Sequence, residues 1–283
     1  MTVSKKVLLA VLAHPDDETF GIGGTLALYS SMGVEVHLVC ATRGEVGDVD
    51  PELMKGYASV AELRENELRC AAGTLGITGV HYLNYRDSGM EGTPDNKHPQ
   101  ALAAADINVV AREVTHYIRL LKPQVVITFD PIGGYRHPDH IAIHKAAVKA
   151  FDEASKETLY PDGLEPYTPQ KLYFQTFPRG FLRFSVLLMR ITGKDPRKFG
   201  RNGDIDLVPI AEARFPVNAT VNYRRVVEKR DQASACHASQ GGARITTGIL
   251  AVFRKVFGVN DQFMRAFPPP GKSREKDLFA NVE

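Results

Sequence analysis

The chain has 283 residues and a formal net charge of +2 at pH 7, and 43% of its residues are hydrophobic and 24% charged. These values are typical of a globular protein with a sizeable core, and they give no reason to expect nucleic-acid binding. The three cysteines (Cys40, Cys70 and Cys236) are far apart and contain no C-x-x-C pair, so we predict neither a disulfide framework nor a cysteine-based zinc site. Unpaired cysteines predict a reducing compartment.

Two apolar runs raise the question of targeting or membrane insertion. Residues 7–13 follow two lysines and mimic a short signal peptide, but the run is short and leads directly into a charged cluster. A continuous run rich in valine and leucine is typical of a buried first strand. Residues 180–193 are too few to span a bilayer and include Arg183 and Arg190, which predicts a core or interface helix. We expect a cytoplasmic protein without membrane insertion.

Strand-like and helix-like patterns alternate through the first half of the chain. The predicted strands cover residues 7–12, 35–40, 80–83, 125–129 and 171–175. The predicted helices cover residues 23–32, 60–75, 107–121 and 139–154. This alternation predicts an α/β fold, a Rossmann-like and mostly parallel sheet with helices on both faces and right-handed crossovers.

The pattern loosens beyond about residue 178. A polar, turn-rich segment at residues 192–209 predicts a surface loop, residues 223–237 predict a helix, and the tail from residue 265 reads as extended. We therefore predict a Rossmann-like core domain at residues 1–178 and a smaller C-terminal lobe at residues 179–283, close to the substrate site.

Two clusters of histidine and acidic residues follow predicted strands. The first, AHPDDE, comes after the first strand and contributes His14, Asp16, Asp17 and Glu18. The second, GGYRHPDH, follows the fourth strand and contributes His137, Asp139 and His140. In a doubly wound sheet of order 3-2-1-4-5 the first and fourth strands are neighbours, and ligands bind beyond their carboxyl ends. Both clusters are therefore expected to open into one crevice.

Two imidazoles and one carboxylate from these loops form a donor set for catalytic zinc, and the set does not exclude iron(II). The additional carboxylate is then available as a base toward an activated water. His144 lies one turn beyond His140, so spacing alone does not choose among His137, His140 and His144 as the second nitrogen ligand. Taken singly, either cluster is also explained by helix capping and surface histidines.

Other segments leave alternatives open. The glycines of GIGG, residues 21–24, suggest a dinucleotide turn, but the full G-x-G-x-x-G is absent and acidic side chains occupy the loop where a pyrophosphate would bind. We expect these glycines to allow close packing instead. Arg64 and Asp87 could hydrogen-bond a polar ligand, or form solvated salt bridges.

The paired motifs AHPDDE and HPDH, about 120 residues apart, resemble the PIG-L/LmbE-like zinc deacetylases. That family includes N-acetylglucosaminyl-phosphatidylinositol de-N-acetylases and the deacetylases and amidases of mycothiol and bacillithiol metabolism. Further matches include TRGEVGD, YRDSGM, KRDQASACHASQ and DLFANV. The resemblance covers most of the chain and is weakest across residues 180–209.

The resemblance implies roles for individual residues. It implies a zinc ion bound by His14, Asp17 and His140, which leaves His144 outside the ligand set. It implies Asp16 as general base, His137 as the group that stabilises the oxyanion, Asp139 as a residue that orients an imidazole, and Tyr135 as a neighbour of the substrate carbonyl. It also implies that Arg64 and Asp87 hold sugar hydroxyls.

The implied function is a zinc-dependent hydrolase that removes the acetyl group from an N-acetylglucosamine-type or related N-acyl amino-sugar conjugate. An amidase that cleaves a larger amide is the alternative on the same scaffold. A metal-containing sugar-binding protein is the non-enzymatic alternative, although metal binding alone would need neither Asp16 nor His137. The expected partner is a small molecule, and the aglycone and a homo-oligomeric state stay open.

Overall fold

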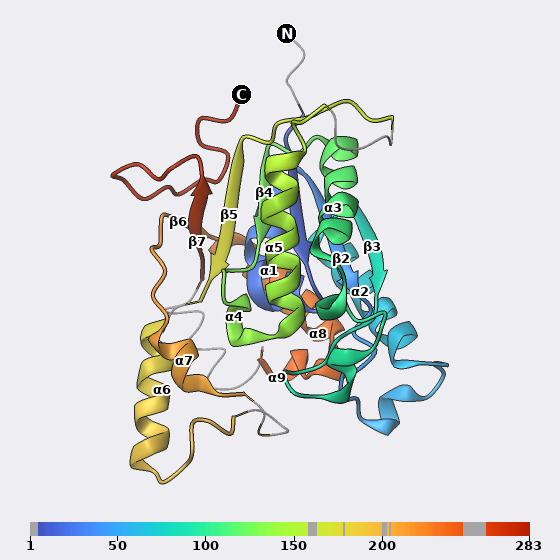
Figure 1. Cartoon of the computed structure of the whole chain (residues 1–283). Helices are drawn as coiled ribbons and strands as arrows, with labels where there is room; N and C mark the ends of the chain where they lie inside the picture. Colours follow the sequence, from blue (N-terminus) through green and yellow to red (C-terminus); the bar gives the residue numbers. More distant parts are fainter. Residues whose placement is uncertain (1–4, 158–162, 178, 200–202, 204, 246–258) are drawn as a thin grey trace.

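A seven-stranded sheet forms the centre of the protein in the computed structural model, which describes residues 5–157, 163–177, 179–199, 203, 205–245 and 259–283 (Figure 1). The strands are β1 (Val7–Leu12), β2 (Glu35–Thr42), β3 (Gly79–Tyr85), β4 (Val125–Thr128), β5 (Lys171–Thr176), β6 (Ala219–Asn222) and β7 (Asn260–Phe267). The helices are α1 (Asp17–Ser31), α2 (Val60–Leu75), α3 (Ile107–Leu121), α4 (Gly133–Arg136), α5 (Pro138–Glu153), α6 (Arg179–Ile191), α7 (Leu207–Glu212), α8 (Val227–Cys236) and α9 (Gly242–Ile245).

The strand order is β3-β2-β1-β4-β5-β7-β6. The first five strands are parallel in the predicted order 3-2-1-4-5, and β7 pairs antiparallel with both β5 and β6. The predicted α/β fold with a mostly parallel sheet is therefore confirmed. The pairing of β1 with β4 brings the ends of these two strands together, and the two polar clusters follow those ends.

Burial explains why β1 and β4 occupy the centre. Every residue of both strands is buried, as expected for parallel strands that are covered on both faces. Figure 1 shows α3 and α5 on one face of the sheet and α1, α2 and α8 on the other. The apolar run at residues 7–12 is thus a buried inner strand that lies between β2 and β4, and none of the described helices is long and apolar enough to cross a membrane.

Several element boundaries differ from the prediction. Helix α1 begins at Asp17 instead of residue 23, because Asp17 and Glu18 form its acidic first turn. Helix α8 begins at residue 227, after a short 3-10 turn. The predicted loop 192–209 contains the start of α7, and its residues 200–202 and 204 lie outside the described residues, as does residue 178 at the predicted domain boundary.

The prediction that the cysteines form no disulfide is wrong. Cys70 on α2 and Cys236 on α8 form a disulfide, with a Cα–Cα distance of 5.8 Å, and Cys40 is free and buried. The two partners are 166 residues apart, and only the packing of α8 against α2 brings them together. The inference of a reducing compartment from unpaired cysteines therefore loses its basis.

The glycines at residues 21–24 serve packing, as predicted. A Cβ atom on Gly24 would lie 2.2 Å from the ring of Tyr223, and one on Gly21 would lie 2.3 Å from Oε1 of Gln175. Helix α1 can therefore lie close to β5 and to the segment before α8 only because these positions lack side chains.

Candidate active site

The loop between β1 and α1 presents the first polar cluster. Asp16 is the residue before α1 and has φ of 128°, a conformation that L residues with side chains rarely adopt. Its backbone N–H donates to Oε2 of Glu18 at 2.9 Å, and its carbonyl accepts from the N–H groups of Thr19 and Phe20. These bonds hold the strained residue, and strain of this kind is concentrated at functional sites.

The loop between β4 and α5 presents the second cluster. Oδ1 of Asp130, a buried residue, accepts from the N–H groups of Ile132 and Gly134 at 3.1 and 2.9 Å. Gly133 has φ of +67°, and a Cβ there would lie 2.9 Å from Cβ of His140. The loop therefore folds back tightly over the start of α5, where it brings its backbone against His140.

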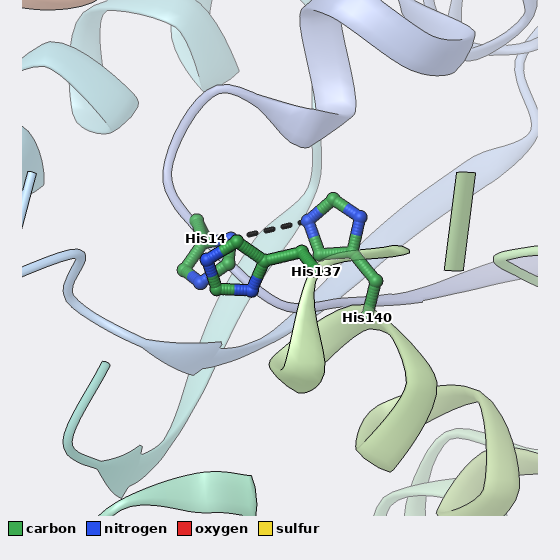
Figure 2. Close-up of side chains that lie close together, drawn as sticks. All are labelled: His14, His137 and His140. Atoms are coloured by element: carbon green, nitrogen blue, oxygen red, sulfur yellow. Dashed lines mark hydrogen bonds between the residues drawn. The ribbon is translucent and has the colours of Figure 1, made fainter. Parts of the chain in front are cut away.

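The two clusters meet, as predicted from the strand order (Figure 2). Nδ1 of His14 lies 3.2 Å from Nε2 of His140. The two carboxylate oxygens of Asp17 lie 3.5 Å from Nδ1 of His14 and 3.3 Å from Nε2 of His140. Donors on a tetrahedral zinc ion at about 2.0–2.1 Å stand about 3.3 Å apart, so the separation of the two imidazole nitrogens fits one ion. One oxygen of the Asp17 carboxylate lies near each of these nitrogens.

Hydrogen bonds on the far side of each ring fix the direction of its lone pair. Nε2 of His14 lies 3.1 Å from Oδ2 of Asp139, so in the neutral ring that nitrogen carries the proton and Nδ1 is left as an acceptor. Nδ1 of His140 lies 3.2 Å from the carbonyl oxygen of Gly133, which leaves Nε2 as the acceptor. Both lone pairs therefore face the Asp17 carboxylate, an arrangement suited to binding a cation.

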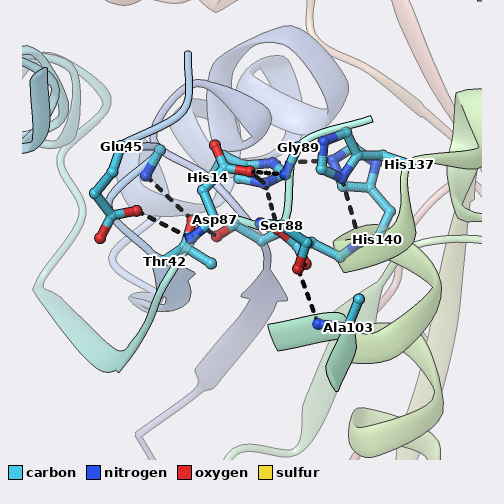
Figure 3. A network of polar contacts seen from close by, with 12 residues as sticks. His14, Thr42, Glu45, Asp87, Ser88, Gly89, Ala103, His137 and His140 are labelled. Carbon is cyan, nitrogen blue, oxygen red and sulfur yellow. Dashed lines mark hydrogen bonds and ion pairs between the residues drawn. The ribbon is translucent and has the colours of Figure 1, made fainter. Parts of the chain in front are cut away.

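Asp139 is the centre of a buried network that joins it to His14, Ser88 and Ala103, three residues labelled in Figure 3. It is fully buried, and its carboxylate accepts from the hydroxyl of Ser88 and, at 2.9 Å, from the N–H of Ser88. The Ser88 hydroxyl oxygen in turn accepts from the N–H of Ala103 at 2.9 Å. Strand β3 and its following loop thus hold the carboxylate that orients His14.

The charges around the imidazoles also favour a cation. Asp17, Asp87 and Asp139 are buried beside His14, and Asp16 lies next to them. Burial alone would lower the pKa of His14, but the carboxylates of Asp87, Asp139 and Asp17 outweigh burial and raise it well above its ordinary value. Burial would likewise raise the pKa of Asp17, but His140 and His14 hold it well below its ordinary range.

Asp16 stands apart from this pattern. Its side chain is 16% exposed, and Nη2 of Arg64 lies 3.0 Å from its Oδ2. Burial raises the pKa of Asp16 to about 6, against the opposing effect of Arg64. The guanidinium of Arg64 also donates to the carbonyl oxygens of Gly44 and Pro15 at 3.0 and 2.6 Å, so it ties the loops after β1 and β2 together.

The remaining predicted residues surround the imidazoles. Nδ1 of His137 accepts from the N–H of Asp139 at 3.2 Å, so its Nε2–H is a donor. Burial and the neighbouring His14 and His140 lower the pKa of His137 well below its ordinary value. The ring of Tyr135 lies 4.9 Å from that of His140, centroid to centroid. His144 donates from Nδ1 to the carbonyl of Phe129 at 2.8 Å and takes no part in the cluster.

Two buried pairs behind the site were not predicted. Nε2 of His237, after α8, lies 2.6 Å from Oε1 of Glu18, and both residues are fully buried. Glu67 on α2 accepts from the N–H and the hydroxyl of Ser239 at 2.7 Å each. The sequence shows Glu18 within the first cluster and His237 within the segment CHASQ, but no spacing pattern predicts that the two residues lie in contact.

A cavity of about 840 Å³ opens over these groups. Its wall includes His14, Asp16, Arg64, Asp87, Tyr135 and His137. The C-terminal part of the chain completes the wall with Ile205 and residues 238–241. The volume lies within the range of sites for small organic ligands.

Comparison with known proteins identifies relatives along the whole chain. The family model described as PIG-L, GlcNAc-PI de-N-acetylase, matches residues 9–151. A protein of Acidothermus cellulolyticus named 1D-myo-inositol 2-acetamido-2-deoxy-alpha-D-glucopyranoside deacetylase is 36% identical over 290 residues, which cover 98% of this chain and 95% of the relative. A Rhodococcus erythropolis protein of the same name is 35% identical and covers 100% of this chain and 99% of the relative.

Solved structures share the fold at lower identity. The N,N'-diacetylchitobiose deacetylase from Pyrococcus horikoshii has a TM-score of 0.64 and 23% identity, covering 93% of this chain and 84% of that one. The 4-carboxy-2-hydroxymuconate hydratase from a Pseudomonas species has a TM-score of 0.62 and 20% identity, covering 95% and 99%. Since a hydratase shares the architecture, the fold alone does not assign a reaction. The motifs, the family match and relatives aligned over nearly the full chain agree, and the chain belongs to the PIG-L family.

Proposed function

We propose that this protein is a metal-dependent hydrolase that removes the acetyl group from an N-acetyl amino sugar. N-acetylglucosamine linked to inositol is the first substrate to test, because full-length relatives carry that name. The observation that carries the proposal is the meeting of His14, Asp17 and His140 next to an open cavity whose wall includes His14 and Asp16.

We propose zinc as the ion, bound by His14, Asp17 and His140, and iron(II) suits the same donors. Such an ion, when bound, polarises the amide carbonyl and lowers the pKa of a water molecule. The fit rests on the two fixed imidazole tautomers and on the donor separations of 3.2–3.5 Å.

Asp16 is proposed as the general base. Its raised pKa of about 6 lies near neutrality, where a base is both largely ionised and able to hold a proton. Asp16 takes a proton from water as the water oxygen attacks the acetyl carbon. The C–N bond then breaks, the amine nitrogen receives the proton that Asp16 took from water, and acetate and the free amino sugar leave. Arg64 positions Asp16 through the ion pair at 3.0 Å.

His137 is proposed to stabilise the oxygen that becomes negative during the attack. Its Nε2–H is a donor at the cavity wall, because Nδ1 is already occupied by the N–H of Asp139. One donor of this kind is typically worth about 3–4 kcal/mol of barrier. Tyr135 lies in the same wall and is proposed to contact the substrate carbonyl. Asp139 acts through His14, whose proton it accepts.

Arg64 and Asp87 are proposed to contact sugar hydroxyls, since both line the cavity. Burial would raise the pKa of Asp87, but His14 and His137 hold it well below its ordinary range, so it presents a charged acceptor. The cavity of about 840 Å³ also leaves room for a larger acyl group, which keeps a larger-amide amidase as the second candidate.

A panel of amides tests the proposal and separates the two candidates. Amine release would be measured with N-acetylglucosamine linked to inositol, free N-acetylglucosamine, diacetylchitobiose and an amide with a larger acyl group. Preference for an acetylated amino sugar supports the deacetylase, and preference for the larger acyl group supports the amidase. Absence of amine release from every substrate by metal-loaded protein would refute both.

Asp16→Asn provides the residue-level test. We expect it to keep the metal and to lose hydrolysis by about 10²–10⁴-fold, the usual contribution of a general base. Asp50→Asn is a matched control, because Asp50 also lines the cavity but its carboxylate accepts from the N–H of Glu52. His140→Ala is expected to lose the metal. Wild-type turnover by Asp16→Asn would contradict the role of Asp16 as base.

Further assignments rest on the same reasoning. We propose residues 1–178 as the catalytic core and residues 179–283 as an elaboration that closes the substrate cavity, since Ile205 and residues 238–241 line it. We propose a cytoplasmic location, because the apolar run at residues 7–12 is a sheet strand. A disulfide is unusual there, so the thiol state of Cys70 in cell extract tests that location.

A further inference from the structure

Among the residues that the structure describes, helix α6 packs against α7 through one apolar side. Val186 is buried and packs with Leu207, Ile210 and Ala211 of α7, and Leu182 and Met189 lie against the same cluster. These three α6 residues are spaced four and three apart, as expected for one helix face. This face is sufficient to attach α6 to α7 at the edge of the molecule seen in Figure 1.

A second apolar side of α6 faces solvent. Phe184, Leu187, Leu188 and Ile191 are exposed by 61%, 56%, 49% and 73%, and we call them the α6 stripe. Their spacing of i, i+3, i+4 and i+7 places them in one row along the helix. Scattered exposed apolar residues are normal, but a continuous row is typical of an interaction surface.

The segment that contains the stripe is positively charged. Between residues 182 and 199 the chain carries five cationic side chains and a single acidic one, Asp195. The cations are Arg183, Arg190, Lys194, Arg197 and Lys198, all of them exposed. The net charge of this segment is therefore +4, although the whole chain carries only +2.

The charge decides between two kinds of occupant. A second copy of the chain docked on the stripe would bring two segments of the same positive charge together, which opposes association. An anionic lipid surface satisfies both features, since apolar side chains enter the acyl boundary while lysine and arginine contact the headgroups. Helix α6 has 13 residues and is too short to span a bilayer, so it would lie along the surface.

We propose that the α6 stripe and its cations dock this protein on an anionic membrane surface. The surface adjoins the cavity, because Phe199, 47% exposed, exchanges backbone hydrogen bonds with Ile205 at 2.9 and 3.1 Å, and Ile205 lines the cavity wall. A docked molecule would therefore hold the mouth of its active site close to the lipid headgroups.

Sedimentation of the full-length protein with vesicles tests this proposal. We expect binding to vesicles of equal parts phosphatidylglycerol and phosphatidylcholine, weaker binding to phosphatidylcholine alone, and weakening of the former by salt. Leu187→Ser with Ile191→Ser should reduce the vesicle-bound fraction at least about tenfold, because two apolar side chains are removed from the interface. Arg190→Glu with Lys194→Glu should remove the preference for phosphatidylglycerol.

A matched control is available on α3. Val109 and Leu120 are exposed by 45% and 49%, and Val109→Ser with Leu120→Ser should bind vesicles as the wild type does. Hydrolysis of a small water-soluble amide should be unchanged in every variant, which verifies the fold. Equal binding to both vesicle types, or wild-type binding by the α6 double serine variant, would overturn the proposal. A dimer that this variant converts to a monomer would also overturn it, because a second copy would then cover the stripe.

Discussion

Asp139→Asn is the change that most directly tests how the proposed metal site is oriented. Asp139 is fully buried and accepts three hydrogen bonds, one from Nε2–H of His14 and two from Ser88. Asparagine retains the shape of the side chain, but it has one acceptor oxygen instead of two and carries no charge. The best orientation keeps that oxygen at the position of Oδ2, where it still accepts from His14 and from the N–H of Ser88.

The expected loss of metal affinity follows from the interactions that Asp139→Asn loses in that orientation. The amide N–H₂ then faces the Ser88 hydroxyl oxygen, which accepts from Ala103 and has a second lone pair free for it. The main loss is therefore the negative charge behind His14, which makes Nδ1 a stronger donor to a metal. Removing such a partner typically weakens metal binding by about 10–100-fold, equal to about 1.4–2.7 kcal/mol.

The assay is titration of metal-free protein with zinc in competition with a chromophoric chelator. His144→Gln is the matched control, because His144 is also buried on α5 and makes a hydrogen bond, to the carbonyl of Phe129 at 2.8 Å, outside the cluster. We expect His144→Gln to lower thermal stability and to leave zinc affinity unchanged. At saturating zinc, Asp139→Asn should recover most of its turnover.

Two results would refute this reasoning. If Asp139→Asn binds zinc within about twofold of the wild type, the carboxylate does not set the donor strength of His14, contrary to the usual effect of such partners. If His144→Gln weakens zinc binding as much as Asp139→Asn does, the loss reflects general damage to α5.

Three further changes test other parts of the structure. Glu18→Gln should lower kcat by about tenfold with metal content unchanged. The reason is that the single amide oxygen of glutamine cannot accept from both the N–H of Asp16 and Nε2 of His237, so Asp16 is held less firmly. An unchanged kcat would contradict this expectation. Gly133→Ala should weaken zinc binding, since its Cβ would lie 2.9 Å from Cβ of His140, whereas Gly56→Ala, also at positive φ but in open space, should cost only about 1 kcal/mol of stability. Cys70→Ser with Cys236→Ser should lower the free energy of unfolding by about 2–5 kcal/mol under oxidising conditions, and equal melting with and without reductant would argue against the disulfide.

The central half of the fold could be predicted because its signals are local. The apolar runs that became β1 and β4 are continuous and bounded by turns, and parallel strands of this kind have few permitted orders. From that order followed the meeting of the AHPDDE and HPDH loops, which the structure brings to within 3.2 Å at His14 and His140. The position of the site was thus fixed by topology rather than by any single motif.

The C-terminal part could not be predicted in the same way. Strands β6 and β7 are separated by 37 residues, whose described part contains α8, α9 and two short 3-10 turns. No regular alternation of strand and helix patterns therefore predicts these two strands. Strand β7 pairs antiparallel with β5 and β6 with β7, and this arrangement depends on tertiary packing instead of local sequence signals. The pairing of Cys70 with Cys236 likewise depends on tertiary packing, because it requires α8 to lie against α2.

The pair of Glu18 and His237 shows why this limit matters for the site itself. Taken alone, Glu18 is one more acid in the first turn of α1, and His237 is a histidine 219 residues away. Together they form a buried pair in which Oε1 of Glu18 contacts His237. The other carboxylate oxygen of Glu18 accepts from the backbone N–H of Asp16 and so helps to hold Asp16 in its strained conformation. The placement of Asp16 thus depends on the C-terminal part through His237 and on the core through Arg64. A site that reads as two motifs in the sequence is, in the folded chain, supported by a third segment.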